Sequence, residues 1–187
     1  MYLRVYLPTD DIPDFASTVY TYWGLDDEEA PLDTTKVVIH PSVTTIKEMA
    51  FFYCRSLKRV TIPDTVARIE SYAIAGCDSL TSIQLPRTLT SIGRWAFRDC
   101  KLLRAVYLPS TVTHIGDQAF RNCKSLRCFY LPQAIEVIGD KVVSGCDQLL
   151  TTVKYSGDDS YGNAVNNIEV NEWLMQRHAN FHLHQVC

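Results

Sequence analysis

Cysteine and histidine are the residues of this sequence that could carry nucleophilic or metal chemistry. The stretch IGDQAFRNCKSLRCFYLP, residues 115–132, places Cys123 and Cys128 five residues apart. Such a pair could be a nucleophile with its neighbour, two metal ligands, a disulfide or part of a packed core. A second group lies near the end of the sequence: His178, His182, His184 and Cys187. The H-x3-H spacing within that group is compatible with a metal pair on a helix.

The spacing of the cysteines along the whole chain shows what surrounds Cys123. Five of them recur every 23 residues: Cys54, Cys77, Cys100, Cys123 and Cys146. Two further columns keep the same period: Ile46, Ile69, Ile92, Ile115 and Ile138, and Leu57, Leu80, Leu103, Leu126 and Leu149. A fixed period of about 20–50 residues indicates a repeat architecture.

The hydrophobic pattern changes within each repeat. Val60 and Ile62 alternate with outward residues, as in a strand, and Pro63 then prevents the ladder from continuing. A second short extended piece ends at the isoleucine column. Next come Ala50, Phe51, Cys54 and Leu57, spaced i, i+1, i+4 and i+7. This spacing is typical of one face of a short helix. We therefore predict an α/β-type repeat solenoid, right-handed, with one parallel strand and one helical turn per unit and non-repeat caps at both ends.

This architecture assigns the five periodic cysteines to the core, where a free thiol behaves as a small hydrophobic group. Neighbours in the column would stand about 4.8 Å apart with parallel side-chain directions. A disulfide needs converging Cβ atoms, and zinc needs tetrahedral ligands, so neither fits a straight column. We expect these thiols to be reduced. Cys128 points to the opposite strand face and is interpreted as a surface thiol that reacts first, together with Cys187.

The repeat pattern IGxxAFxxCxxLxxVxLPxxLxx resembles the BspA-like, Treponema-type leucine-rich repeat, over residues 37–151. The resemblance implies a leucine-rich-repeat solenoid that binds proteins through its strand face. Such repeats occur in bacterial surface proteins and in intracellular and surface proteins of unicellular eukaryotes. The glycine of the motif is present at Gly93, Gly116 and Gly139 but is replaced by Lys47 and Glu70.

The predicted organisation has three parts. Residues 1–36 form an acidic N-terminal cap, in which DDEEAPLD (26–33) is an exposed acidic loop. The five repeats span residues 37–59, 60–82, 83–105, 106–128 and 129–151. Residues 152–187 form a loop and a capping helix, the helix within 171–181, and we expect the chain to be a truncated product of a longer one.

Charge and composition narrow the classes of function. The formal net charge is −3, but residues 1–36 carry −6, residues 37–151 carry +5 and residues 152–187 carry −2. Neither a signal peptide nor a run of about 18 apolar residues is present, so the sequence predicts no membrane partner. The odd count of seven cysteines fits a closed disulfide framework poorly. We expect a eukaryotic intracellular, cytoplasmic protein.

Two predicted surfaces could bind a partner. The strand face consists of the outward residues of the first strand of each unit: Lys36 and Val38, Arg59 and Thr61, Ser82 and Gln84, Ala105 and Tyr107, and Cys128 and Tyr130. The basic ridge runs beside it: Arg55 and Lys58, Asp78 and Thr81, Lys101 and Arg104, Lys124 and Arg127, and Asp147 and Leu150. Tyrosine is common at binding hot spots but also simply suits strands, and the ridge could be an ordinary solvated edge.

The sequence predicts a non-catalytic module that binds a protein or peptide, possibly an acidic one, without a cofactor or metal. The candidate binding residues are Arg59, Thr61, Gln84, Tyr107, Tyr130, Lys101, Arg104, Lys124 and Arg127. A polyanion-binding module is the first alternative, although no nucleic-acid motif accompanies the charge. A metal-dependent enzyme is the second, although no acid, base and nucleophile converge in the sequence. His114 occupies a variable outward position and is not assigned a catalytic role.

Overall fold

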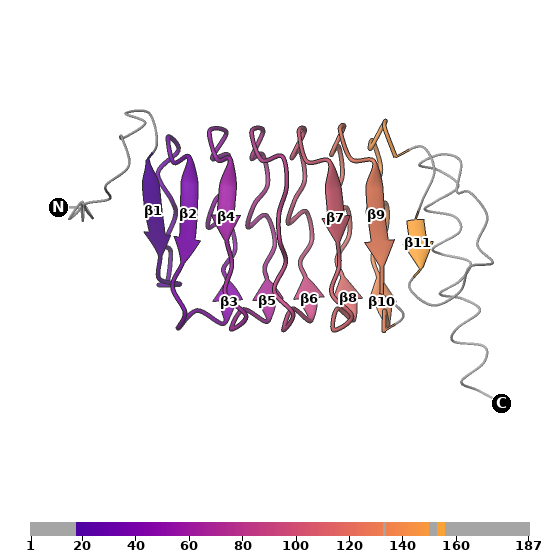
Figure 1. The fold of residues 1–187 in the computed structure, drawn as a ribbon, viewed down its shortest axis with the longest axis horizontal. Helices are drawn as coiled ribbons and strands as arrows, with labels where there is room; N and C mark the ends of the chain where they lie inside the picture. The colour runs from indigo at the N-terminus through magenta and orange to yellow at the C-terminus, as the bar shows by residue number, and fades with distance from the viewer. Residues whose placement is uncertain (1–17, 133, 150–152, 156–187) are drawn as a thin grey trace.

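The computed structural model describes residues 18–132, 134–149 and 153–155, and the chain winds through them as a solenoid of stacked coils (Figure 1). The first strands of the coils are β1 (Val19–Tyr22), β2 (Lys36–Ile39), β4 (Arg59–Thr61), β7 (Ala105–Tyr107), β9 (Cys128–Leu131) and β11 (Val153–Tyr155). The second strands are β3 (Thr45–Ile46), β5 (Arg68–Ile69), β6 (Ser91–Ile92), β8 (His114–Ile115) and β10 (Val137–Ile138). All the strand pairs are parallel, which confirms the predicted solenoid of parallel strands.

The strand register explains why the columns of the sequence are buried. Val37 pairs with Val60, and Ile69 pairs with Ile92, so each partner lies 23 residues further along the chain. Identical inward side chains therefore stack directly on one another. The residues of the cysteine and leucine columns and most of the isoleucine column are buried. Phe97 and Phe120 also stack, with their ring centroids 4.9 Å apart. One continuous core results, which no single coil could form alone.

The predicted helical turn is wrong, because the described residues contain no helix. The five periodic cysteines are called the ladder cysteines below. We call the segment between each second strand and the ladder cysteine that follows it the corner. Its residues alternate between two kinds of hydrogen bond. The N–H of Phe51 donates to the Ala73 carbonyl of the next coil (2.8 Å), whereas the N–H of Phe52 donates to the Met49 carbonyl, three residues back (2.9 Å). In an α-helix every N–H would instead reach four residues back.

Left-handed backbone conformations keep the corners from becoming helical. Two positions per corner have φ near +55° to +75°: Met49 and Tyr53, Tyr72 and Gly76, Trp95 and Asp99, Gln118 and Asn122, and Lys141 and Gly145. A right-handed helix needs negative φ throughout, so one such residue every four positions ends any helical run. The corner is consequently a chain of tight turns, and its alternate N–H groups form a third ladder between coils.

The strand face is interrupted in the repeat 83–105, where a strand was predicted. Residues 82–85 form no strand, and β4 and β7 end two separate sheets on either side of them (Figure 1). We call residues 82–85 the seam. Gln84 occupies the outward position where the neighbouring coils have Thr61 and Tyr107, and glutamine favours strands less than threonine and tyrosine do.

The N-terminal coil is shorter than the others. Tyr20 of β1 pairs with Val37 of β2, an offset of 17 residues instead of 23. Tyr22 is buried and meets the Phe51 ring edge-on, with centroids 5.1 Å apart. Glu28 accepts hydrogen bonds from Tyr20 Oη (2.8 Å) and from the N–H of Trp23 (3.0 Å). Within the predicted exposed acidic loop, Glu28 is thus a structural anchor.

The glycine of the repeat motif allows the closest approach between coils. A Cβ atom built on Gly116 would lie 2.5 Å from the backbone nitrogen of Arg94 in the preceding coil. Any side chain there would require the two coils to move apart. At the first position of this glycine column stands Lys47. Its ammonium group pairs with Asp26, and its backbone N–H donates to Tyr22 Oη (3.1 Å). Contacts to the N-terminal coil therefore replace the glycine contact there.

The first-strand sheet continues past residue 151. Strand β11 pairs with β9 in the parallel register, and it falls in the segment for which the sequence predicted a loop and a capping helix. The capping helix within 171–181 and the group His178, His182, His184 and Cys187 lie outside the described residues. The part of the chain that is described holds no helix that could span a lipid bilayer.

Candidate functional site

The ladder cysteines lie where the sequence placed them and form no disulfide. Their exposed fractions are 0 to 1%. Each thiol donates to a backbone carbonyl of the preceding coil; Cys100 Sγ lies 3.1 Å from the Ile74 oxygen and Cys123 Sγ lies 3.2 Å from the Phe97 oxygen. Burial raises the pKa of the Cys100 thiol to about 12. The Cys100 thiol is therefore a protonated hydrogen-bond donor of the core and not a nucleophile.

Four candidate residues of the strand face are exposed, but they are divided between two separate sheets and the seam. Arg59 and Thr61 are exposed on β4, and Gln84 is exposed in the seam. Tyr107 is 62% exposed on β7. The backbone of Tyr130 on β9 pairs directly with that of Tyr107. The seam therefore separates Arg59 and Thr61 from the two tyrosine positions, and the face is not one flat ladder.

The positive charge of the basic ridge is concentrated on two adjacent coils, just before β7 and β9. The N–H of Arg127 donates to the Arg104 carbonyl (2.8 Å), and the N–H of Ser125 donates to the Lys101 carbonyl (3.0 Å). The backbones of these coils are therefore in contact at the ridge, and the exposed side chains form one cluster: Lys101, Arg104, Lys124 and Arg127. We call this cluster the cationic quartet.

Asp78 divides the ridge. Its carboxylate lies 3.1 Å from Lys101 Nζ on one side and 4.0 Å from Arg55 Nε on the other. Both cations are more than half exposed and Asp78 is 30% exposed, so solvent screens each pair, which contributes about 0–1 kcal/mol to stability. Their main effect is on the electrostatic potential of the ridge, because the charges of Arg55 and Lys101 are partly neutralised. Among the described residues, Lys58, Arg104 and Lys124 make no ion pair.

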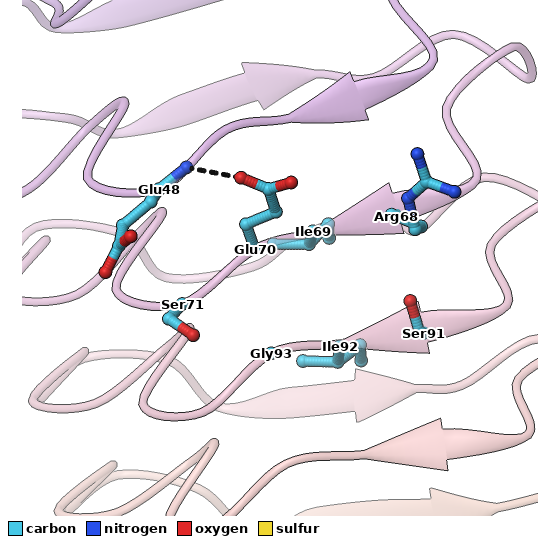
Figure 2. Close-up of a pocket in the computed structure, with 8 residues that line it drawn as sticks. All are labelled: Glu48, Arg68, Ile69, Glu70, Ser71, Ser91, Ile92 and Gly93. Carbon is cyan, nitrogen blue, oxygen red and sulfur yellow. Dashed lines mark hydrogen bonds between the residues drawn. The ribbon is translucent and has the colours of Figure 1, made fainter. Parts of the chain in front are cut away.

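A shallow depression of about 280 Å³ lies on the side of the second strands (Figure 2). It is lined by Glu48, Arg68, Ile69, Glu70, Ser71, Ser91, Ile92 and Gly93. The N–H of Glu48 donates to Glu70 Oε2 (3.0 Å). Glu48, Arg68 and Glu70 are all exposed, so water solvates their charges. Catalytic acids and bases usually need burial to shift their proton affinity, and this depression does not supply it.

No set of three side chains suited to hold a metal ion occurs among the described residues. His114 is exposed, and its Nδ1 lies 2.7 Å from the hydroxyl of Thr113.

Sequence reasoning missed two features that bear on the site: the seam and the ion pairs of Asp78. The outward Gln84 was the available signal for the seam.

Comparison with known proteins supports the repeat. Residues 30–150 match the family described as BspA type leucine rich repeat region, in six copies. The match begins before the predicted boundary at residue 37. Among curated proteins, none matches this sequence.

Three solved structures are similar. A leucine-rich repeat protein from Bacteroides ovatus is 39% identical with a TM-score of 0.59, over 62% of this chain and 30% of that one. The leucine rich repeat protein of T. pallidum is 29% identical with a TM-score of 0.66, over 75% and 72%. A leucine rich cell surface protein from Faecalibacterium prausnitzii is 28% identical with a TM-score of 0.66, over 71% and 35%. The chain thus spans about a third of the length of two of these proteins.

Proposed function

Since the chain belongs to the family of BspA-type leucine-rich repeat proteins, we propose that it is a non-catalytic scaffold that binds a protein or peptide partner. The partner contacts the strand face and the basic ridge. Repetition supports this proposal, because stacked coils display the same surface position at regular intervals, and side chains at such positions vary without disturbing the core.

The observation that carries the proposal is the cationic quartet next to Tyr107. The quartet lies in the turns that lead into β7 and β9, and Tyr107 is exposed on β7. Tyrosine and arginine are enriched among residues that dominate binding energy. A partner with acidic side chains complements the quartet and gains from electrostatic steering. We propose Arg59, Thr61, Gln84, Tyr107 and Tyr130 as the remaining contact residues.

A pull-down with a charge-reversed variant tests this function. Arg104→Glu with Lys124→Glu replaces two cations of the quartet that make no ion pair within the described chain. We expect this variant to bind the wild-type partners at least tenfold more weakly, and Tyr107→Ala to cost about 1–2 kcal/mol of binding energy. The matched control reverses two exposed cations away from the quartet, Arg68→Glu with Arg87→Glu. Recovery of the same partners by all three variants would refute the proposal.

The quartet also supports a polyanion as a second candidate ligand. Four exposed cations on two adjacent coils suit a chain of sulfates or phosphates as well as an acidic protein. Heparin affinity chromatography over a range of salt concentrations separates these functions. A polyanion-binding module would bind heparin with an affinity that falls steeply with salt, and it would show no preference for a protein partner.

A metal-dependent enzyme remains the rival from another class, and it has an inexpensive test. Its metal ligands would be His178, His182, His184 and Cys187, which lie outside the described residues. We expect elemental analysis of the purified chain to find less than about 0.1 metal ion per chain, whereas a zinc site would retain about one.

A cytoplasmic location likewise stays a prediction, which cell fractionation can check.

A further inference from the structure

Three cations of the quartet are unpaired and stand on two adjacent turns. Arg104 precedes β7, and Lys124 and Arg127 precede β9; all three are exposed, and none makes an ion pair within the described residues. The backbone hydrogen bond from Arg127 to Arg104 (2.8 Å) sets the two arginines on neighbouring rungs, about 4.8 Å apart. The three side chains can therefore reach the same anionic group.

The acids of the neighbouring turns do not neutralise these cations. Asp78 is held by Lys101 on one side and by Arg55 on the other. Asp147 is exposed on the following turn, and among the described residues it makes no ion pair with Lys124. The positive charge of Arg104, Lys124 and Arg127 is consequently available to a ligand.

The guanidinium group of Arg127 is already oriented. Its Nε donates to Gln148 Oε1 (3.0 Å), and its two terminal nitrogens make no hydrogen bond or ion pair to another described residue. A side chain that is held in place loses less conformational freedom when a ligand binds. The planar fork of an arginine matches the oxygens of a phosphate, which it binds with two parallel hydrogen bonds.

An exposed apolar side chain lies among these cations. Leu102 is 48% exposed between Lys101 and Arg104, and Ser125 takes the same position on the adjacent turn. A chain of sulfates or phosphates offers nothing apolar to cover a leucine, whereas a peptide does. Leu102 therefore favours a peptide over a simple polyanion as the ligand of the quartet.

From these observations we propose that Arg104 and Arg127 bind one phosphoryl group, carried by a phosphoserine or phosphothreonine in a peptide segment of the partner. This inference rests on the proposed function and specifies the partner's chemistry. A phosphorylated side chain carries a charge of about −1.5 to −2 on three acceptor oxygens, so a single group can contact both arginines, with Lys124 beside them. An aliphatic residue two positions away lies on the same side of an extended segment and covers Leu102.

Carboxylates fit this arrangement less well. Side chains on the same side of an extended peptide are about 7 Å apart, which is wider than the spacing of the two rungs, and each carboxylate brings one charge and two oxygens. Recognition of phosphoserine and phosphothreonine by clustered arginines uses the charge and the bidentate geometry together.

The test is an NMR titration of isotope-labelled protein with the peptide acetyl-Gly-Leu-Ala-phosphoserine-Ala-Leu-Gly-amide, which has a leucine two residues from the phosphoserine in both directions. We expect the side-chain Nε–H signals of Arg104 and Arg127 to shift, and Arg104→Gln with Arg127→Gln to bind at least tenfold more weakly. Peptides with serine or glutamate in place of phosphoserine should lose at least the same factor. Leu102→Ser should weaken binding about threefold, and Arg68→Gln with Arg87→Gln, two exposed cations elsewhere, should bind like wild type. Unchanged amide signals away from the quartet verify that each variant is folded.

Equal binding of the phosphoserine and glutamate peptides would overturn the inference, as would binding that survives in the Arg104→Gln/Arg127→Gln variant or no binding at all. If Leu102→Ser binds the phosphopeptide like wild type, the quartet is a polyanion surface and not a site for a phosphorylated peptide.

Phosphatase treatment separates this inference from the proposed function. A protein partner that the Arg104→Glu/Lys124→Glu variant fails to recover, but that binds wild type equally before and after dephosphorylation, would sustain the proposed function and overturn the phosphoryl site. Recovery of the same partners by all the pull-down variants would refute the proposed function, and the peptide titration would still decide whether the quartet binds phosphoserine.

Discussion

At the residue scale, the ladder thiols both fill the core and link the coils. Each Sγ–H reaches back to a carbonyl of the coil before it, as Cys77 does to Phe51 at 3.2 Å. Serine at this position would retain a donor but would bury a more polar group, and alanine would lose the donor and leave a cavity. Cysteine is small enough for the column and polar enough for the carbonyl.

The first prediction concerns alkaline pH. Burial raises the pKa of the Cys100 thiol to about 12 and that of Cys54 to about 11, from 9.0 for a free thiol. Above pH 9 the unfolded chain therefore releases these thiol protons while the folded chain still holds them. The contribution of the protonated thiols to the free energy of unfolding is complete below pH 9 and is lost as the pH rises through the pKa values of the folded state. Each such thiol lowers the free energy of unfolding by up to about 1.4 kcal/mol per pH unit in that window.

Urea unfolding between pH 7 and pH 10.5 measures this effect. We expect stability to fall steeply above pH 9, and Cys100→Ala to be less stable at pH 7 but to have a smaller slope above pH 9. A slope that is unchanged in Cys100→Ala would contradict the assignment of a raised pKa to this thiol.

At the element scale, the corners decide whether the repeat is an α/β or an all-β unit. The sequence correctly predicted their buried residues, such as Ala96, Phe97 and Cys100. It could not predict their backbone, because a chain of turns puts positions i, i+1, i+4 and i+7 on one side just as a helix does. A usable signal was the column of residues that tolerate positive φ: Gly76, Asp99, Asn122 and Gly145.

The second prediction separates a corner from a helix by the sign of one effect. Lys141 is exposed with φ of 54°, so Lys141→Gly should raise the free energy of unfolding by about 0.5–1 kcal/mol, as the left-handed strain is removed. In a helix the same change would lower it by about 1 kcal/mol. Chemical denaturation of the two proteins decides between these signs. Lys124→Gly is the control, because Lys124 is exposed without positive φ, and it should destabilise the protein.

At the scale of the whole molecule, stability comes from contacts between neighbouring coils, so one damaged coil should disrupt the stack. Ile92 is 2% exposed and pairs with Ile69 and Ile115. We expect Ile92→Asp to cost about 4 kcal/mol or more, since it buries an unpaired charge, and to abolish cooperative unfolding. Ser91→Asp places the same charge on the outward neighbour and should change stability by less than about 0.5 kcal/mol. Circular dichroism during urea unfolding compares the two; equal effects would contradict the assigned core.

The size of the strand face limits the affinity of the described coils. The five rungs of this face are β2, β4, the seam, β7 and β9. Rungs about 4.8 Å apart and about 13 Å wide offer roughly 300 Å², less than the roughly 800 Å² per partner of a standard interface. Several residues of the predicted face and ridge, such as Thr61, Tyr107 and Arg104, are exposed. The sequence did not predict the division of these surfaces by the seam and Asp78, because both depend on contacts between coils. Tight binding by this chain therefore needs the ridge and the strand face together.

The measurement that tests the binding proposal most directly is photo-crosslinking from defined positions. A benzoyl-phenylalanine is placed at Thr61 or Gln84 on the strand face, and at Arg68 or His114 on the opposite sheet, all exposed residues. We predict that the same partner is crosslinked from Thr61 and Gln84 and that neither Arg68 nor His114 yields it. Crosslinks to that partner from Arg68 or His114, with none from Thr61 and Gln84, would contradict the proposal that the strand face is the working surface.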